Sequence, residues 1–224
     1  MDEGFDGRLT GSCVYCGGEP TTVDHVPSRV LLDEPFPPKL PTVPACEPCN
    51  NGFSSDERYL ACFLECVIAG SVEPTAVRRE KIGRILAERP DIVSEITACR
   101  RVHESGTTLW DPDPPRVLNV VLKLARGHMA YEGGESRDDD PEEVMILPLI
   151  AMTEGQRLDF ETPPMLDGWP EIGSRAFLRA AGVGSDPNLD GGWQVVQEGR
   201  YRYLFSTTGV RMVIGEYLAC EVVW

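Results

Sequence analysis

Residues 13–28 read CVYCGGEPTTVDHVPS and residues 43–53 read VPACEPCNNGF, and these two stretches decide the fold of the N-terminal part of the chain. Each contains a Cys-x-x-Cys pair. A two-residue spacer lets both sulfurs of a pair face one ion, so two such pairs are typical of a tetrahedral zinc site with four thiolate ligands. The sequence therefore predicts a structural zinc ion here. The predicted ligands are Cys13, Cys16, Cys46 and Cys49.

The composition limits the class of protein. The chain has 224 residues, 42% of them apolar, which is ordinary for a globular protein. Its formal net charge of −15 excludes a protein held to nucleic acid by its overall field, because phosphate binding draws on a basic surface. The acidic start MDEGFDGR does not resemble an export signal, and no stretch approaches the ~18 apolar residues of a membrane helix. We therefore expect a cytoplasmic protein with no membrane partner, whose paired cysteines bind metal.

The dipeptide Asp24-His25 lies between the two cysteine pairs. Paired knuckles, Asp-His, the nearby Pro27 and an Asn directly after the last knuckle cysteine occur in this order over residues 10–66. This arrangement resembles the zinc-bearing branch of the HNH endonucleases. The resemblance implies their ββα-metal motif, in which a strand ends in Asp-His, a loop and a second strand follow, and the Cys-x-x-Cys-Asn turn opens a helix.

The resemblance also implies roles for individual residues. His25 would be the general base, and Asp24 and Asn50 would hold a catalytic divalent cation, Mg²⁺ or Mn²⁺. The chemistry is coherent, because an imidazole with a pKa near 6.5 can take a proton from water at about neutral pH. A hydrated cation with few oxygen ligands can stabilise the charge on phosphorus and on the leaving oxygen. The zinc would be purely structural, since four cysteines leave no open coordination position.

The expected activity is cleavage of DNA phosphodiesters to 5′-phosphate and 3′-hydroxyl ends, as in this family, which includes bacterial defence nucleases. Arg29, four residues after His25, is a candidate phosphate contact. Two positions depart from the family pattern. Pro41 replaces an Asn that orients the His loop, so a backbone group is expected to take its place, and Phe53 replaces a Lys near the start of the helix.

Several alternatives stay open at this point. Asn51 competes with Asn50 as a cation ligand, and Glu57 falls on the same helical face as Asn50. The chain could instead be a non-catalytic zinc-binding module, derived from an HNH fold, that binds nucleic acid or protein. A third reading is an interaction protein or toxin whose strand-rich C-terminal region binds a dedicated protein partner.

The predicted fold class is α+β, with the zinc-stabilised ββα motif followed by central helices and a strand-rich α+β region. We expect an HNH-like domain over residues 1–70, and a helical linker region with an α+β domain of unknown role over residues 71–224. Helices are predicted from Ser54 or Ser55 to Gly70 and over 75–89, 116–128 and 173–182. Strands are predicted over 144–152 and over 193–206, the latter as a hairpin turning at Glu198-Gly199; residues 210–224 are predicted to form one long strand or two short ones.

Other polar and sulfur side chains have simpler interpretations. Cys62 and Cys66 fit an apolar helix stripe better than a second metal site. The alternation in RYRYLFS, residues 200–206, indicates either base stacking or a half-buried hairpin. The basic residues of the helix predicted at 75–89 form either a phosphate-facing patch or a solvated helix face; they are Arg78, Arg79, Lys81 and Arg84. We expect His103 and His128 to be non-catalytic. We expect Cys99 and Cys220 to be buried thiols.

Overall fold

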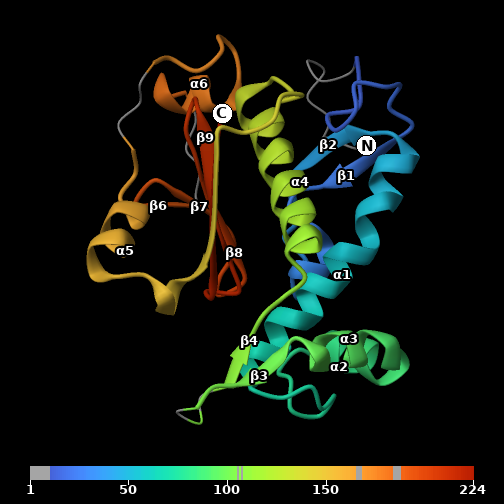
Figure 1. The fold of residues 1–224 in the computed structure, drawn as a ribbon. Helices are drawn as coiled ribbons and strands as arrows, with labels where there is room; N and C mark the ends of the chain where they lie inside the picture. Colours follow the sequence, from blue (N-terminus) through green and yellow to red (C-terminus); the bar gives the residue numbers. More distant parts are fainter. Residues whose placement is uncertain (1–10, 105, 107, 165–167, 184–187) are drawn as a thin grey trace. The chain divides into compact units, whose positions relative to one another are not determined.

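The computed structural model describes residues 11–104, 106, 108–164, 168–183 and 188–224; the acidic start of the chain lies outside the described residues. Within them the fold is mixed α+β, with six α-helices and a six-stranded antiparallel sheet (Figure 1). The expected fold class is confirmed at this level. No helix among the described residues has the length and apolar character required to cross a membrane.

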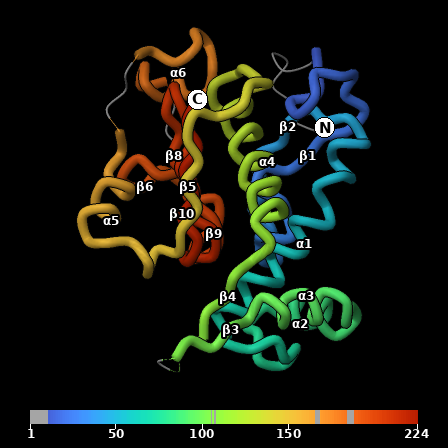
Figure 2. Tube along the Cα trace, in the orientation of Figure 1, coloured from blue at the N-terminus to red at the C-terminus, as the bar shows by residue number. Residues whose placement is uncertain are grey.

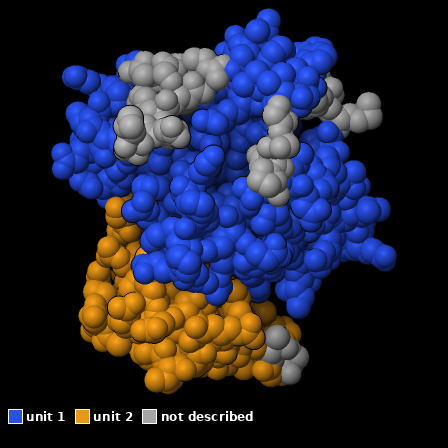
Figure 3. All heavy atoms as spheres, turned by 180° about the vertical axis from the view of Figure 1, so that it is seen from behind, with its two compact units in different colours: residues 1–52, 121–224 blue, residues 53–120 orange. Residues whose placement is uncertain are grey.

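The chain forms two compact units, coloured separately in Figure 3. The first combines residues 1–52 with 121–224, and the second is 53–120. The chain passes between them inside two long helices, α1 (Glu47–Ala69) and α4 (Pro114–Gly133). The compact units therefore have other limits than the domains predicted from the sequence. The predicted domain boundary near residue 70 remains an expectation from the sequence.

The N-terminal part of the first unit is a pair of short strands followed by a helix. Strand β1 (Thr22–His25) pairs antiparallel with β2 (Thr42–Ala45), with Asp24 opposite Val43. A short 3₁₀ helix, η1 (Arg29–Leu31), lies in the connection. Helix α1 begins at Glu47, seven residues before the predicted Ser54, because tertiary contacts organise its polar first turns: Thr21 Oγ1 accepts a hydrogen bond from the Glu47 N–H at 3.0 Å.

The six-stranded sheet contains the C-terminal half of the chain. The predicted hairpin at Glu198-Gly199 is present, and Gly199 adopts a φ of +70° in its turn. Residues 210–224 form two strands rather than one, with Gly215 in the tight turn between them. The strand order is β5 (Glu143–Pro148), β10 (Leu218–Val223), β9 (Gly209–Ile214), β8 (Tyr201–Phe205), β7 (Trp193–Gln197) and β6 (Leu189–Asp190).

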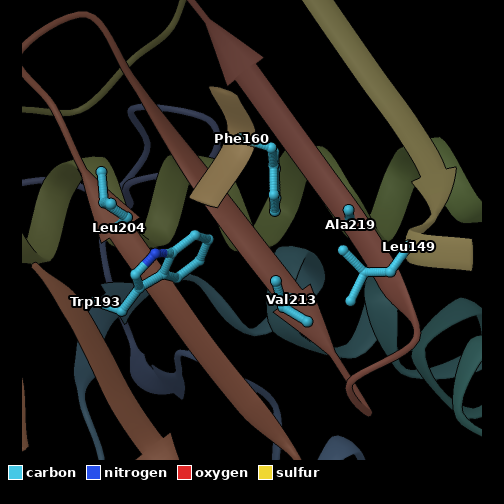
Figure 4. Close-up of a cluster of buried hydrophobic side chains, with 6 residues drawn as sticks. All are labelled: Leu149, Phe160, Trp193, Leu204, Val213 and Ala219. Carbon is cyan, nitrogen blue, oxygen red and sulfur yellow. The ribbon is translucent and has the colours of Figure 1, made fainter. Parts of the chain in front are cut away.

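One face of this sheet packs against α5 (Glu154–Glu161), a helix absent from the sequence prediction. The sequence did not predict this helix because it has few apolar residues, although Thr153 and Gln156 form a reciprocal capping box at its start. The remaining elements of this part are η2 (Leu149–Ala151) and the predicted short helix α6 (Arg175–Ala180). Figure 4 shows the apolar cluster on this face: Leu149, Phe160, Trp193, Leu204, Val213 and Ala219.

The other face of the sheet packs against the C-terminal part of α4, residues 121–133. The His128 ring stacks on Tyr203 with 3.8 Å between centroids, and its Nε2 lies 2.8 Å from the Tyr201 hydroxyl. On its other side the same helix lies beside the strand pair (Figure 2). Gly127 of the helix packs closely against Val26, the residue after β1. Within the first unit, α4 therefore lies between the N-terminal strands and the sheet.

The second unit is built from the C-terminal part of α1, the first part of α4 and the segment between them. The predicted helix at 75–89 is observed as α2 (Glu80–Glu88), and Pro90, expected only to end it, also begins α3 (Pro90–Ala98). The short strands β3 (Arg100–Val102) and β4 (Thr108–Trp110) pair antiparallel. Arg116 links the helices through ion pairs to Asp56 at 2.8 Å and Glu95 at 2.7 Å.

Two details of the second unit correct the sequence interpretation. Arg79 is buried, with Glu65 3.9 Å away, so it does not belong to an exposed basic patch. Cys99, the residue that follows α3, is only half-buried rather than buried, and its Sγ lies 3.5 Å from the Tyr59 hydroxyl. Cys62 and Cys66 are fully buried, as the apolar stripe indicated.

Candidate active site and metal centre

The four predicted zinc ligands converge. All four sulfur atoms of Cys13, Cys16, Cys46 and Cys49 lie within 4.8 Å of one another. The Cys16 and Cys46 sulfurs are 3.6 Å apart, too far for a disulfide, which requires about 2.05 Å. Tetrahedral Zn²⁺ with Zn–S bonds of about 2.3 Å would separate its sulfurs by roughly 3.8 Å. The cluster is therefore positioned to hold a metal ion and is consistent with zinc.

Local backbone geometry builds this cluster. In the first knuckle the Cys13 N–H donates to Gly18 O at 2.7 Å, and Gly17 adopts a φ of +70°. Burial alone would raise the pKa of the Cys13 thiol, but hydrogen bonds from nearby backbone N–H groups outweigh it and bring the pKa to about 7. Desolvation and the neighbouring sulfurs raise the pKa of Cys49. A shared cation would relieve this crowding of thiolates.

The first knuckle also reaches the Asp-His segment. Tyr15, between the two cysteines of the pair, donates a hydrogen bond from its hydroxyl to Asp24 Oδ2 at 2.8 Å. The adjacent Val14 is buried in a cluster with Val26, Val43 and Ala130, which joins the knuckle to both strands and to α4. The cysteine cluster is therefore connected to Asp24 by one side chain and one small apolar core.

Asp24 is only 7% exposed and makes an ion pair with Lys123 of α4. The Lys123 Nζ lies 2.8 Å from Asp24 Oδ2, 2.8 Å from Ser28 Oγ and 3.2 Å from the His25 carbonyl oxygen. A lysine that is 1% exposed requires such partners, because an unpaired buried charge is costly. Lys123 thus holds residues 24–28, which we call the Asp-His turn, against α4 by contacts near both ends of this segment.

His25 occupies the last position of β1 and is half-buried. Desolvation is the largest cause of its lowered pKa; the positive charges of Arg29 and Lys123 lower it further, while Asp24 acts in the opposite direction. A lowered pKa keeps the imidazole neutral at pH 7, which is the form that can accept a proton.

The helix start is joined to the same strand by Asn50. Its Nδ2 donates to the Val23 carbonyl at 3.2 Å, so the residue after the last cysteine contacts the residue before Asp24. The neighbouring Asn51 is exposed. Pro41 stands where the family pattern has an Asn that orients the His loop. Its carbonyl accepts a hydrogen bond from the Val26 N–H at 2.9 Å, so a backbone group holds the loop after His25.

The remaining candidate residues differ in exposure and packing. Arg29 is exposed, with its guanidinium carbon 5.4 Å from the centre of the Phe36 ring. Glu57 belongs to the second compact unit. Tyr201 and Tyr203 are buried on the α4 face of the sheet, so their alternation reflects packing rather than an exposed stacking surface.

Sequence reasoning missed the contribution of the C-terminal sheet to this region. Gln197 donates from Nε2 to Asp33 O at 2.9 Å and accepts from the Asp33 N–H at 2.8 Å, and Arg200 pairs with the Asp33 carboxylate at 2.5 Å. These bonds join the β7–β8 turn to the loop that follows η1. The roles of Tyr15 and Lys123 were also missed; the only signal was that Lys123 falls on a polar face of its predicted helix, together with Asn119 and Arg126.

Comparisons of the chain with protein-family models, with curated proteins and with solved structures found no match.

Proposed function

We propose that this chain is a metal-dependent, HNH-type endonuclease that hydrolyses phosphodiester bonds in DNA. One observation carries the proposal: Asp24 and His25 end a strand that is joined through Asn50 to the first turn of α1, directly beside the cluster of four cysteines. This order of a base, two oxygen ligands and a structural metal site is what the resemblance to that family implies.

In this proposal His25 accepts the proton of the attacking water on a ring nitrogen. The Lys123 bond to the His25 carbonyl and the Pro41 bond to the Val26 N–H both hold the peptide unit that directly follows His25. A base held in this way loses little freedom when substrate binds, and positioned proton transfer contributes a factor of about 10² to 10⁴ in rate.

The residues present fit a hard divalent cation. Asp24 and Asn50 offer a carboxylate and an amide oxygen, which are the donors Mg²⁺ and Mn²⁺ prefer. Tyr15 and Lys123 both contact Oδ2 of the Asp24 carboxylate, and the Asn50 amide nitrogen donates to the Val23 carbonyl. When bound, such a cation would supply positive charge to the phosphate and to the leaving oxygen.

The cysteine cluster has a structural role in this account, since four thiolates leave a zinc ion no open position. Arg29, exposed near the Asp-His turn, is the candidate contact for a substrate phosphate. DNA contact must be local, because the formal net charge of −15 repels a polyanion overall. The C-terminal sheet then serves as a scaffold for the site or as the surface for a protein partner.

A non-catalytic zinc module is the second candidate, and one observation favours it. Asp24 is already compensated by Lys123 at 2.8 Å, as a carboxylate with a purely structural role would be. In that case the knuckles, the strands and α4 form a scaffold for binding protein or nucleic acid.

Incubation of the zinc-loaded protein with supercoiled plasmid distinguishes the two functions. We expect nicking with Mg²⁺ or Mn²⁺, 5′-phosphate ends, and no nicking in buffer freed of divalent cations. A labelled RNA in a parallel reaction tests the choice of DNA. Absence of cleavage of either substrate with every cation would instead support the binding module.

A further inference from the structure

Asp24 has an internal counter-ion on an element that the sequence places far away. Lys123 lies 99 residues beyond Asp24 in the chain, and its ammonium group contacts one carboxylate oxygen, Oδ2, at 2.8 Å. The same oxygen accepts the Tyr15 hydroxyl at 2.8 Å. Oδ2 is therefore committed to the interior of the protein, and Oδ1 is the oxygen that remains for a cation.

Lys123 is held firmly in this position. Besides Asp24, its ammonium contacts Ser28 Oγ at 2.8 Å and the His25 carbonyl at 3.2 Å. One turn farther along α4, a Cβ at Gly127 would lie 2.5 Å from a methyl group of Val26, which shows how closely the helix approaches the segment after His25. The buried ammonium is therefore held beside Asp24 by three oxygen atoms, on a helix that packs closely against this segment.

We infer that Lys123 is a positioning residue that makes cation binding at Asp24 depend on the substrate; the inference rests on the proposed function. Asp24 supplies one negative charge to the site, and Lys123 supplies one positive charge next to it. The amide of Asn50 is neutral, so these three residues together offer a divalent cation almost no net charge. The negative charge that a tightly bound cation requires must then come from a phosphodiester.

The expected size of the effect follows from how strongly one adjacent charge acts. A neighbouring charge within about 4 to 6 Å changes the binding of a proton to a carboxylate by roughly one to three powers of ten. Removing the Lys123 charge should therefore tighten Mn²⁺ binding to the free protein by about tenfold or more. A lysine with only a structural role predicts the opposite, because its loss would disorder Asp24 and weaken binding.

Mn²⁺ titration of the zinc-loaded free protein, followed by electron paramagnetic resonance, tests this. Lys123→Met removes the charge and keeps most of the packing volume, and Lys39→Met at an exposed position is the matched control. We expect tighter Mn²⁺ binding for Lys123→Met alone, and loss of that gain when Asp24→Asn is added. Equal or weaker binding by folded Lys123→Met would overturn the inference.

A second measurement does not require Lys123→Met and therefore decides the matter if that variant does not fold. Mn²⁺ affinity is measured with and without a short phosphorothioate DNA duplex, with Asp24→Asn protein plus the same duplex as background. We expect the duplex to raise the affinity at least about tenfold; an unchanged affinity contradicts the inference. Both readouts are independent of cleavage, so an inactive protein that shows these shifts would refute the nuclease proposal alone.

Discussion

The hydroxyl of Tyr15 donates a hydrogen bond to Asp24 Oδ2 over 2.8 Å. Because Tyr15 lies between Cys13 and Cys16, the turn that supplies two of the zinc ligands also positions the carboxylate beside His25. The structural metal site and the candidate reaction centre are therefore separated by a single side chain. Changes on one side of this contact should be measurable on the other.

Tyr15→Phe removes that hydrogen bond and keeps the ring. A hydrogen bond to a charged group contributes about 1.5 to 3 kcal/mol, so the free energy of unfolding should fall by that amount. Zinc content should stay the same, because the four sulfurs are untouched. Urea denaturation and zinc assay check both expectations, and an unchanged unfolding free energy would show that the contact does not stabilise the site.

Cys46→Ser should release the zinc and lower the melting temperature strongly, because the free energy of metal binding is also free energy of folding. The half-buried Cys99, outside the cluster, provides the control: Cys99→Ser should retain its zinc. Zinc assay and thermal unfolding on the two variants give the comparison. If Cys46→Ser kept one zinc per chain and an unchanged melting temperature, the four-thiolate site would be wrong.

Gly127→Ala should destabilise the protein by roughly 1 to 3 kcal/mol, since its Cβ would lie 2.5 Å from Val26 Cγ2. The control is Gly52→Ala in α1, where a Cβ meets nothing within 4 Å and alanine should stabilise the helix by up to about 1 kcal/mol. Chemical denaturation measures both. Adding Val26→Ala to Gly127→Ala should recover part of the loss, and no recovery would argue against this close approach.

Because His128 is buried, we expect the free energy of unfolding to fall in acid. The ring is fully buried against Tyr201 and Tyr203; burial, then the positive charge of Lys123, lowers its pKa well below the usual value near 6.5. Above pH 6.5 the His128 ring is neutral in the folded and in the unfolded protein. Below pH 6.5 the ring takes up a proton only in the unfolded protein. Stability should therefore fall with decreasing pH, by up to about 1.4 kcal/mol per pH unit from this residue alone.

His128→Gln keeps a hydrogen-bonding group near Tyr201 without the titration. The difference in unfolding free energy between the two proteins, measured from pH 8 to pH 5, should change in favour of the variant as the pH falls. Loss of zinc in acid affects both proteins and largely cancels in this difference. A difference that is constant with pH would mean that folding does not lower the pKa of His128.

Local patterns were sufficient to predict much of this fold. The two Cys-x-x-Cys pairs determine the metal cluster because their geometry is set within four residues each. The hairpin at Glu198-Gly199 followed from alternating side chains and a glycine that allows positive φ. Helix α5 was missed because its capping box at Thr153 starts a segment with little apolar periodicity.

The contacts that shape the candidate site are long-range, and for that reason the sequence alone did not predict them. Lys123 fell on a polar row of α4, but nothing in the sequence placed Asp24 opposite it. The bonds between Asp33 and Gln197 join segments 164 residues apart. A pattern of spacing identifies which residues can do chemistry, whereas packing decides which of them meet.

The rate of plasmid nicking by His25→Ala tests the central claim most directly. The variant should keep its zinc and fold, and lose about 10² to 10⁴ in rate under Mg²⁺ or Mn²⁺, because the imidazole that takes the proton of water is gone. His103→Ala, at an exposed histidine outside the site, should cleave like the unaltered protein. Nicking by His25→Ala at the rate of His103→Ala would contradict the assignment of His25 as the general base.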